Sequence, residues 1–299
     1  MLQLEKETLI GSIPPLVTPF YQDSVDYDVY AKLVEFQIKN GSHGILVTGT
    51  TAEPSTLTVS ERKKCVDVAV EAANKKIPVV AATGSQSLEE TIVLSSHAER
   101  SGANALLIVT PYYIRPPQRG LVNYYTEIGK HITIPWMIYH IPGRAAVNIS
   151  LETLDQISNN CPNFVGIKHA VDDISFVSKC INHFGSDFRI FVGLEDLSYP
   201  MMSVGACGLM NAVGNLMPQK LVKLCESVWN GDLILAKKIH YELFEINQAV
   251  FYDTNPIPMK YMMKRTGIIP HNEHRLPMVS ADKKLQARLD QILQRIELI

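Results

Sequence analysis

Residues 13–26 read IPPLVTPFYQDSVD, and this stretch distinguishes between the two α/β folds that the chain could adopt. It opens with an apolar run typical of a strand buried on both faces and continues into a turn. An open doubly wound sheet would carry a glycine-rich phosphate loop at this first turn. The turn here, TPFYQDSVD (18–26), contains no glycine. The stretch therefore favours a closed (β/α)8 barrel.

Seven further apolar runs repeat the same theme, each followed by a polar turn and a segment of helical periodicity. The runs do not alternate and are rich in β-branched residues, as parallel strands covered on both faces are. They are GILVTG (44–49), PVVAATG (78–84), ALLIVTP (105–111), PWMIYH (135–140), FVGIKHA (164–170), RIFVGLE (189–195) and GLMNAVGN (208–215). Eight strands that alternate with helices predict an α/β fold, a (β/α)8 TIM barrel.

The chain continues beyond the barrel. The last predicted barrel helix is MPQKLVKLCESVWNG (217–231), and three helical stretches follow it, at about 232–250, 256–266 and 280–297. We therefore expect a catalytic barrel over residues 1–231 and a C-terminal three-helix extension over residues 232–299. No low-complexity linker separates the two parts, so the extension should pack against the barrel.

Composition and charge exclude several classes of partner. The chain of 299 residues carries 28 basic and 30 acidic side chains, a net charge of −2, without a block of like charge. Neither nucleic acid nor an anionic membrane surface is therefore an expected partner. The start of the chain does not resemble a signal peptide, and no apolar run approaches the ~20 residues of a membrane span. The 5 scattered cysteines, without C-x-x-C spacing, are typical of reduced thiols in a cytoplasmic enzyme.

Lys168 is the unusual side chain at the ends of the runs, where barrel enzymes place their catalytic groups. It follows Val165, Gly166 and Ile167 in an apolar strand, so it cannot be a solvated surface charge. Burial favours the neutral amine and lowers the pKa of a lysine, and a neutral amine attacks carbonyl groups. A buried salt bridge to an acid such as Glu53 is the structural alternative.

Other strand ends carry groups that suit this chemistry. Tyr139 ends the preceding run, and its phenol could move protons to and from a carbinolamine; a core tyrosine is the alternative. Thr50 and Thr51 follow the second run and either cap the turn or bind a substrate carboxylate. Arg144, in the loop IPGR (141–144), suits a carboxylate, and a surface ion pair is its alternative.

Metal chemistry is not expected. The pair His271-x-x-His274 lies in a proline-flanked loop far from the strand ends, so it is a poor candidate for a ligand pair. A carbonyl lyase without a metal must activate its donor as an enamine, which again points to Lys168. We therefore expect no cofactor, only a covalent imine between Lys168 and its substrate.

Six motifs occur in order along the runs: GTTAEPSTLT (49–58), TPYYIRPPQRGL (110–121), YHIPGRAAVNI (139–149), GIKHA (166–170), VGLED (192–196) and TNPIPMK (254–260). Together they resemble the dihydrodipicolinate synthase / N-acetylneuraminate lyase family of Schiff-base pyruvate aldolases, along nearly the whole chain. The resemblance implies that Lys168 forms the imine with pyruvate and that Tyr139 donates and accepts protons. Thr50 and Tyr113 would complete a proton relay, with Tyr113 lent by a neighbouring subunit of a homotetramer, a dimer of dimers.

The same resemblance assigns the small-molecule binding residues. Thr51 would bind the pyruvate carboxylate, backbone near Gly193 and Met210 would line the same site, and Arg144 would receive the carboxylate of a second substrate. The threonine pair, the stretch PYYxxPxQxG and the arginine after YxxPG are typical of the dihydrodipicolinate synthase branch. That branch condenses pyruvate with L-aspartate-4-semialdehyde to 4-hydroxy-tetrahydrodipicolinate in diaminopimelate and lysine biosynthesis.

Two other functions stay open. Another pyruvate lyase of the family would cleave a 2-keto-3-deoxy sugar acid or a substrate of the N-acetylneuraminate type, with the same imine chemistry. A catalytically silent paralogue would bind metabolites only. The sequence departs from the family pattern at Ala52, His140, His169 and Asn211, which is compatible with a different aldehyde partner. By strand alternation, His169 should point toward the helix layer.

Inhibition by lysine is expected to be weak or absent. In inhibited members of the family the lysine site lies at the starts of the helices after the second and third strands. The corresponding positions here are Pro54, Val59, Gln86, Glu90 and Tyr112. Val59 stands where inhibited forms carry a histidine, and Glu90 belongs to the predicted capping box SLEE (87–90).

Overall fold

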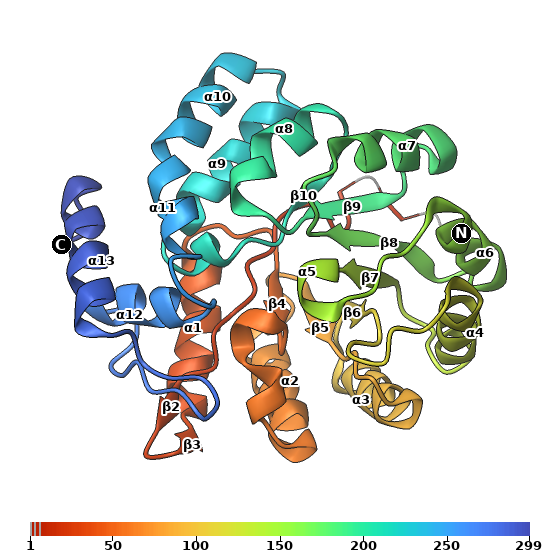
Figure 1. Ribbon diagram of the computed structural model, residues 1–299, viewed down its shortest axis with the longest axis horizontal. Helices are drawn as coiled ribbons and strands as arrows, with labels where there is room; N and C mark the ends of the chain where they lie inside the picture. Colours follow the sequence, from red (N-terminus) through yellow and green to blue (C-terminus); the bar gives the residue numbers. More distant parts are fainter. Residues whose placement is uncertain (1, 3, 6) are drawn as a thin grey trace.

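Eight parallel strands curl into one sheet in the order β1-β10-β9-β8-β7-β6-β5-β4 (Figure 1). The computed structural model describes residues 2, 4, 5 and 7–299. The strands are β1 (Gly11–Ser12), β4 (Ile45–Val47), β5 (Val79–Ala82), β6 (Ala105–Val109), β7 (Trp136–His140), β8 (Phe164–His169), β9 (Arg189–Val192) and β10 (Gly208–Leu209). A parallel bridge between Pro15 and Leu46 joins the segment after β1 to β4, so the sheet returns on itself.

The first strand begins earlier than the sequence predicts, at Gly11 instead of within 13–20. Pro14 and Pro15 have no backbone N–H, so the regular ladder stops before them. The chain nevertheless stays paired, because Leu16 N donates to Leu46 O at 2.9 Å.

The turn after this segment contains a hairpin that the sequence does not predict. Strand β2 (Phe20–Tyr21) pairs antiparallel with β3 (Ser24–Val25). Gln22 and Asp23 connect them with positive φ angles of 49° and 61°, the conformation that two-residue hairpin turns require. Glycine usually marks such turns in a sequence, and none is present here.

Helices cover the outside of the sheet (Figure 1). Five of them, α1, α2, α3, α6 and α7, begin at a side chain that accepts a hydrogen bond from a free N–H group of the first turn. Thr58, for example, forms a full capping box with Glu61 at the start of α2. The helices of this layer are α1 (Tyr27–Lys39), α2 (Val59–Ala73), α3 (Leu88–Ser101), α4 (Gln118–Gly129), α6 (Leu151–Asn160), α7 (Ile174–Phe184), α8 (Ser198–Ser203) and α9 (Pro218–Trp229).

The C-terminal region contains four helices where the sequence predicts three. They are α10 (Leu233–Glu242), α11 (Phe244–Ala249), α12 (Ile257–Arg265) and α13 (Lys283–Arg295). The predicted stretch 232–250 is divided at Leu243, whose backbone stays in the helical region with φ −87° and ψ −10°. The division is therefore a tightened turn within the stretch and not a loop. The boundary between residues 231 and 232 stays a prediction.

Apolar side chains cover both faces of the sheet, which explains why the strands read as unbroken apolar runs. The core inside the barrel includes Ile13, Leu46, Val80, Leu107, Met137, Val165 and Phe191. The core between sheet and helices includes their chain neighbours Val47, Ala81, Leu106, Ile138, Phe164 and Ile190. Within the described part of the chain, no helix is long and apolar enough to cross a bilayer.

Candidate active site

Lys168 and Tyr139 lie side by side at the carboxyl ends of β8 and β7. Their Cα atoms are register partners, so both side chains point into the barrel at the same height. Lys168 Nζ lies 4.4 Å from the centre of the Tyr139 ring, and the lysine is 4% exposed. Burial lowers the pKa of Lys168 to about 8; Glu195 opposes the shift and Arg144 adds to it. About a tenth of this amine is therefore neutral at pH 7.

Gly193 and Met210 follow the next two strands of the sheet. Gly193 comes directly after β9 and donates its N–H to His169 O at 2.8 Å. A Cβ atom at Gly193 would lie 2.9 Å from Lys168 Cε, so the absence of a side chain leaves the space that the lysine fills. Met210, after β10, is buried and donates its N–H to Val192 O at 2.9 Å.

Glu195 is a buried acid that sequence reasoning did not single out. It begins the turn η3 (Glu195–Leu197) after β9, and its Oε1 accepts the N–H of Ala212 at 2.5 Å. Burial raises its pKa to about 7, against the opposing effects of the Ala212 N–H and of Lys168. The pKa values of Lys168 and Glu195 therefore depend on each other. Glu195 belongs to the motif VGLED (192–196), in which only Gly193 was predicted to line the site.

Hydroxyl groups face the phenol of Tyr139 from the turn η1 (Thr50–Ala52), which follows β4. Burial raises the pKa of Tyr139 to about 12, while Thr50 and Arg144 lower it. The phenol is therefore protonated at neutral pH and can donate. Thr51 Oγ1 accepts a hydrogen bond from Asn255 Nδ2 at 3.0 Å, which leaves its own O–H free for a ligand.

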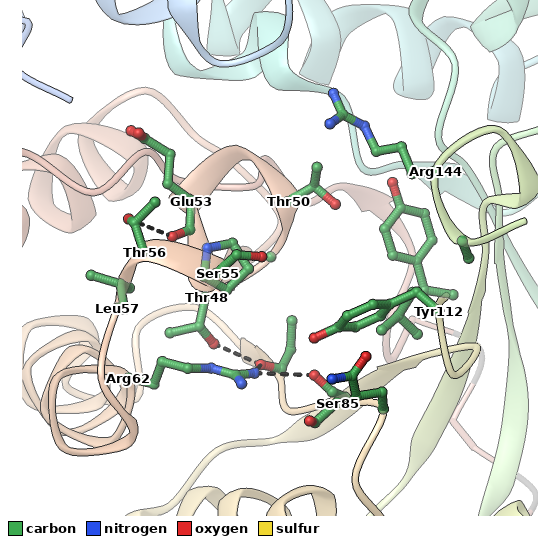
Figure 2. Close-up of a pocket in the computed structure, with 18 of the residues that line it drawn as sticks. Thr48, Thr50, Glu53, Ser55, Thr56, Leu57, Arg62, Ser85, Tyr112 and Arg144 are labelled. Carbon is green, nitrogen blue, oxygen red and sulfur yellow. Dashed lines mark hydrogen bonds between the residues drawn. The ribbon is translucent and has the colours of Figure 1, made fainter. Parts of the chain in front are cut away.

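A cavity of about 770 Å³ opens at this end of the barrel. Thr50, Tyr139 and Arg144 line it, and Figure 2 shows the guanidinium of Arg144 extending above Thr50 from the short helix α5 (Pro142–Ala145). Arg144 Nη2 donates to Asn255 O at 3.4 Å. Asn255 thus touches both predicted carboxylate ligands, Thr51 and Arg144. Its motif is visible in the sequence, but only the fold brings it to this site.

Glu53 pairs with Lys260 and not with Lys168, which excludes Glu53 as the salt-bridge partner of Lys168. Its Oε1 accepts from Lys260 Nζ at 2.9 Å, and its Oε2 lies 3.0 Å from His274 Nδ1. All three side chains are buried, Lys260 completely. The C-terminal region therefore neutralises the acid that ends the Thr50–Ala52 turn.

The two histidines of the pair His271-x-x-His274 have separate partners. His274 bonds to Glu53, whereas the ring of His271 stacks on Tyr21 with 4.6 Å between ring centres. Across the residues that the structure describes, no three His, Cys, Asp or Glu side chains gather as metal ligands. All 5 cysteines are free thiols, and burial raises the pKa of Cys65 to about 12.

Tyr113 does not reach the cavity of its own chain. It is 86% exposed with a φ of 73°, whereas Tyr112 beside it lines the cavity (Figure 2). The structure therefore gathers the other predicted residues at the carboxyl ends of the strands and leaves Tyr113 on the surface.

Glu90 forms only half of the predicted capping box. Ser87 Oγ accepts the N–H of Glu90 at 3.3 Å, as predicted, but the carboxylate of Glu90 binds Arg62 Nη1 at 3.2 Å. Arg62 is buried and needs a counter-ion, and the N–H of Ser87 has another acceptor, Ser85 Oγ at 3.2 Å. Arg62 lies at the opposite end of the cavity from Arg144 (Figure 2).

Comparison with known proteins agrees with this geometry. The profile of the Dihydrodipicolinate synthetase family matches residues 8–296. The 4-hydroxy-tetrahydrodipicolinate synthase of Thermus thermophilus is 39% identical over 290 residues, 97% of each chain. Dihydrodipicolinate synthase from Aquifex aeolicus superposes with a TM-score of 0.95 at 36% identity, covering 97% of this chain and 99% of that one. A chloride-inhibited dihydrodipicolinate synthase from Acinetobacter baumannii, solved with pyruvate, gives 0.94 at 32% identity, with 98% and 100% covered. The chain belongs to the dihydrodipicolinate synthetase family.

Proposed function

We propose that the protein condenses pyruvate with L-aspartate-4-semialdehyde to form 4-hydroxy-tetrahydrodipicolinate, as a Schiff-base lyase of lysine and diaminopimelate biosynthesis. The observation that carries this proposal is the buried Lys168 amine, 4.4 Å from the centre of the ring of Tyr139, which lines the cavity together with Arg144. The relatives named above carry this activity in their names.

The reaction begins at the amine. Neutral Lys168 Nζ attacks the ketone carbon of pyruvate, and the carbinolamine loses water when the phenol of Tyr139 protonates the departing hydroxyl. Thr51 donates its free O–H to the pyruvate carboxylate. Loss of a methyl proton from the imine then gives the enamine, with the positive imine nitrogen as electron acceptor. For this reason we propose that no metal or organic cofactor is needed.

The second half of the reaction joins the two substrates. The enamine carbon attacks the aldehyde, and the new alkoxide takes a proton. The amino group that came with the aldehyde then attacks the imine carbon, closes the ring and expels Lys168 Nζ. Arg144 binds the carboxylate of the incoming aldehyde, since its planar guanidinium matches a carboxylate in two hydrogen bonds.

A second copy of the chain completes the proton relay in this proposal. Tyr113 is too exposed to serve its own cavity, so we propose that it extends into the site of a neighbour and joins Thr50 and Tyr139. Tight dimers that exchange Tyr113 then assemble into a homotetramer. Protons leave the buried site through this chain of hydroxyl groups.

Reductive trapping tests the proposal. Pyruvate with borohydride should add one reduced pyruvate to Lys168, detected by intact mass and peptide mapping, and Lys168→Ala should gain none. Absence of the adduct in the wild type would overturn the enzyme function and leave a metabolite-binding protein. A screen of aldehydes on wild type and Arg144→Ala then identifies the partner. Unchanged turnover of aspartate semialdehyde by Arg144→Ala would favour a lyase of sugar acids.

A further inference from the structure

Two buried histidines stand directly behind the reactive pair. His140 and His169 are register partners, one residue beyond Tyr139 and Lys168 on the same two strands. Because side chains alternate along a strand, the histidines point outward where the reactive pair points inward. Both rings pack on Phe176 of α7, at 5.7 Å and 5.1 Å between ring centres. Neither ring has meaningful contact with solvent.

The hydrogen bond between the two rings has a defined direction. His140 Nδ1 lies 3.3 Å from His169 Nδ1, so one nitrogen must donate and the other accept. His140 Nε2 accepts the backbone N–H of Ile149 at 3.4 Å, which places the proton of neutral His140 on Nδ1. His140 therefore donates to His169, and His169 carries its own proton on Nε2.

His140 also closes the loop that carries Arg144. The loop leaves β7 at His140 itself, and the bond from Ile149 returns its far end to the same imidazole ring. Residues 141–148 are therefore held at both ends by one residue, through its backbone at one end and through its side chain at the other. A single ring thus contacts strand β8, helix α7 and the end of the Arg144 loop.

We propose that His140 and His169 are a positioning pair for the reaction. Their hydrogen bond fixes the spacing of β7 and β8 at the height of Tyr139 and Lys168, and the Ile149 bond fixes the Arg144 loop. Neither histidine touches substrate. The effect is geometric, because a displacement of about 1 Å in a reacting group costs about 100-fold in rate.

The two bonds of His140 can be separated by substitution. His169→Ala removes the cross-strand bond and keeps the Ile149 bond. His140→Ala removes both. His140→Asn keeps a short side chain whose amide N–H can donate to His169 Nδ1, but this side chain is too short to reach Ile149. Trp136→Phe is the control, because Trp136 pairs with Phe164 at the other end of the same two strands, at 4.9 Å between ring centres.

Two measurements distinguish the bond between His140 and His169 from the bond between Ile149 and His140. The inference they test rests on the proposed function. The single-turnover rate of borohydride-trapped imine should fall about tenfold or more in His169→Ala and His140→Ala and recover in His140→Asn. The KM for the aldehyde should rise about tenfold in both His140 variants and stay near the wild-type value in His169→Ala. Trp136→Phe should lower the melting temperature and leave both values unchanged.

The outcomes separate the inference from the proposed function. Wild-type values in His169→Ala and His140→Ala would overturn the pairing, and so would losses that follow melting temperature alone and appear equally in Trp136→Phe. If the wild type forms no imine, the proposed function fails first. If the wild type forms the imine and the variants match it, only the positioning pair is overturned.

Discussion

Gly193 leaves the space in which the side chain of Lys168 lies, since a Cβ atom at position 193 would stand 2.9 Å from Lys168 Cε. The same atom would stand 2.9 Å from the Cβ of Ala170. Both distances are shorter than real Cβ contacts, so the lysine must move when Gly193 gains a side chain. The glycine is thus a condition for the position of the amine.

Gly193→Ala should therefore slow imine formation about 10- to 100-fold, because the amine leaves its place beside Tyr139. Quenching the reaction with borohydride at a series of times traps the imine and measures this rate. Gly120→Ala is a matched control, since the nearest atom to its new Cβ lies 3.5 Å away and alanine suits helix α4. Equal rates in the two variants would contradict the prediction.

The pH dependence of imine formation should follow Lys168. Burial lowers the pKa of this amine to about 8 and Glu195 raises it, so the rate rises with pH up to about 8 and then levels. Glu195→Gln removes the negative charge, lowers the pKa further and moves the midpoint to lower pH. Rates measured at saturating pyruvate from about pH 6 to pH 10 decide this. A midpoint that stays in place or moves upward would show that Glu195 does not act on the amine.

L-Lysine should not inhibit the enzyme at sub-millimolar concentration. Glu90, one of the positions that correspond to the lysine site, already binds Arg62 at 3.2 Å. Val59 offers no hydrogen bond at the place of the histidine in inhibited forms. The assay is a titration of lysine with both substrates near their KM. An inhibition constant below one millimolar would contradict the prediction.

Lys260→Met should lower the free energy of unfolding by about 3–5 kcal/mol, because it removes the lysine cation from the buried Glu53 carboxylate and leaves His274 as its remaining ion-pair partner. Chemical denaturation in urea measures the loss. The double variant with Glu53→Gln should recover part of it, since no uncompensated charge remains. Lys130→Met breaks an exposed pair with Glu127 and should cost less than about 1 kcal/mol.

Acid should destabilise the protein through His140. Burial, with His169, lowers the pKa of His140 to about 4, below its ordinary 6.5. The unfolded chain therefore binds the proton first, and stability is lost as pH falls from about 6.5 toward 4, by up to about 3 kcal/mol. His140→Asn should show a shallower loss across this range in denaturation curves. Equal slopes would indicate that His140 does not contribute.

Features that depend on residues close together in the chain could be predicted from the sequence. Features that depend on contacts between distant residues could not. Each strand is an apolar run because both of its faces are buried, so seven of the eight strands lie within the predicted runs. Lys168 and Tyr139 could be found because each ends such a run. The exception is β1, which lies before its predicted run because Pro14 and Pro15 interrupt the ladder of backbone hydrogen bonds within that run.

The missed features arise from contacts across the chain. Asn255 donates a hydrogen bond to Thr51 although the two residues are 204 positions apart in the chain, so no local sequence pattern predicts this contact. Glu90 looked like a capping residue because Ser87 stands three positions before it, but Arg62 from another helix takes its carboxylate. Leu243 divides a stretch whose periodicity reads as one helix.

The bond between Glu53 and Lys260 also sets an order of events during synthesis, because the two residues are 207 positions apart. A ribosome that adds about 5–20 residues per second exposes Glu53 some 10 to 40 seconds before its counter-ion. Until Lys260 is present, the Glu53 carboxylate must remain hydrated, so the incomplete barrel stays open to water at this turn. The last helices close it, and a chain that stops short of them carries the reactive lysine without a finished pocket.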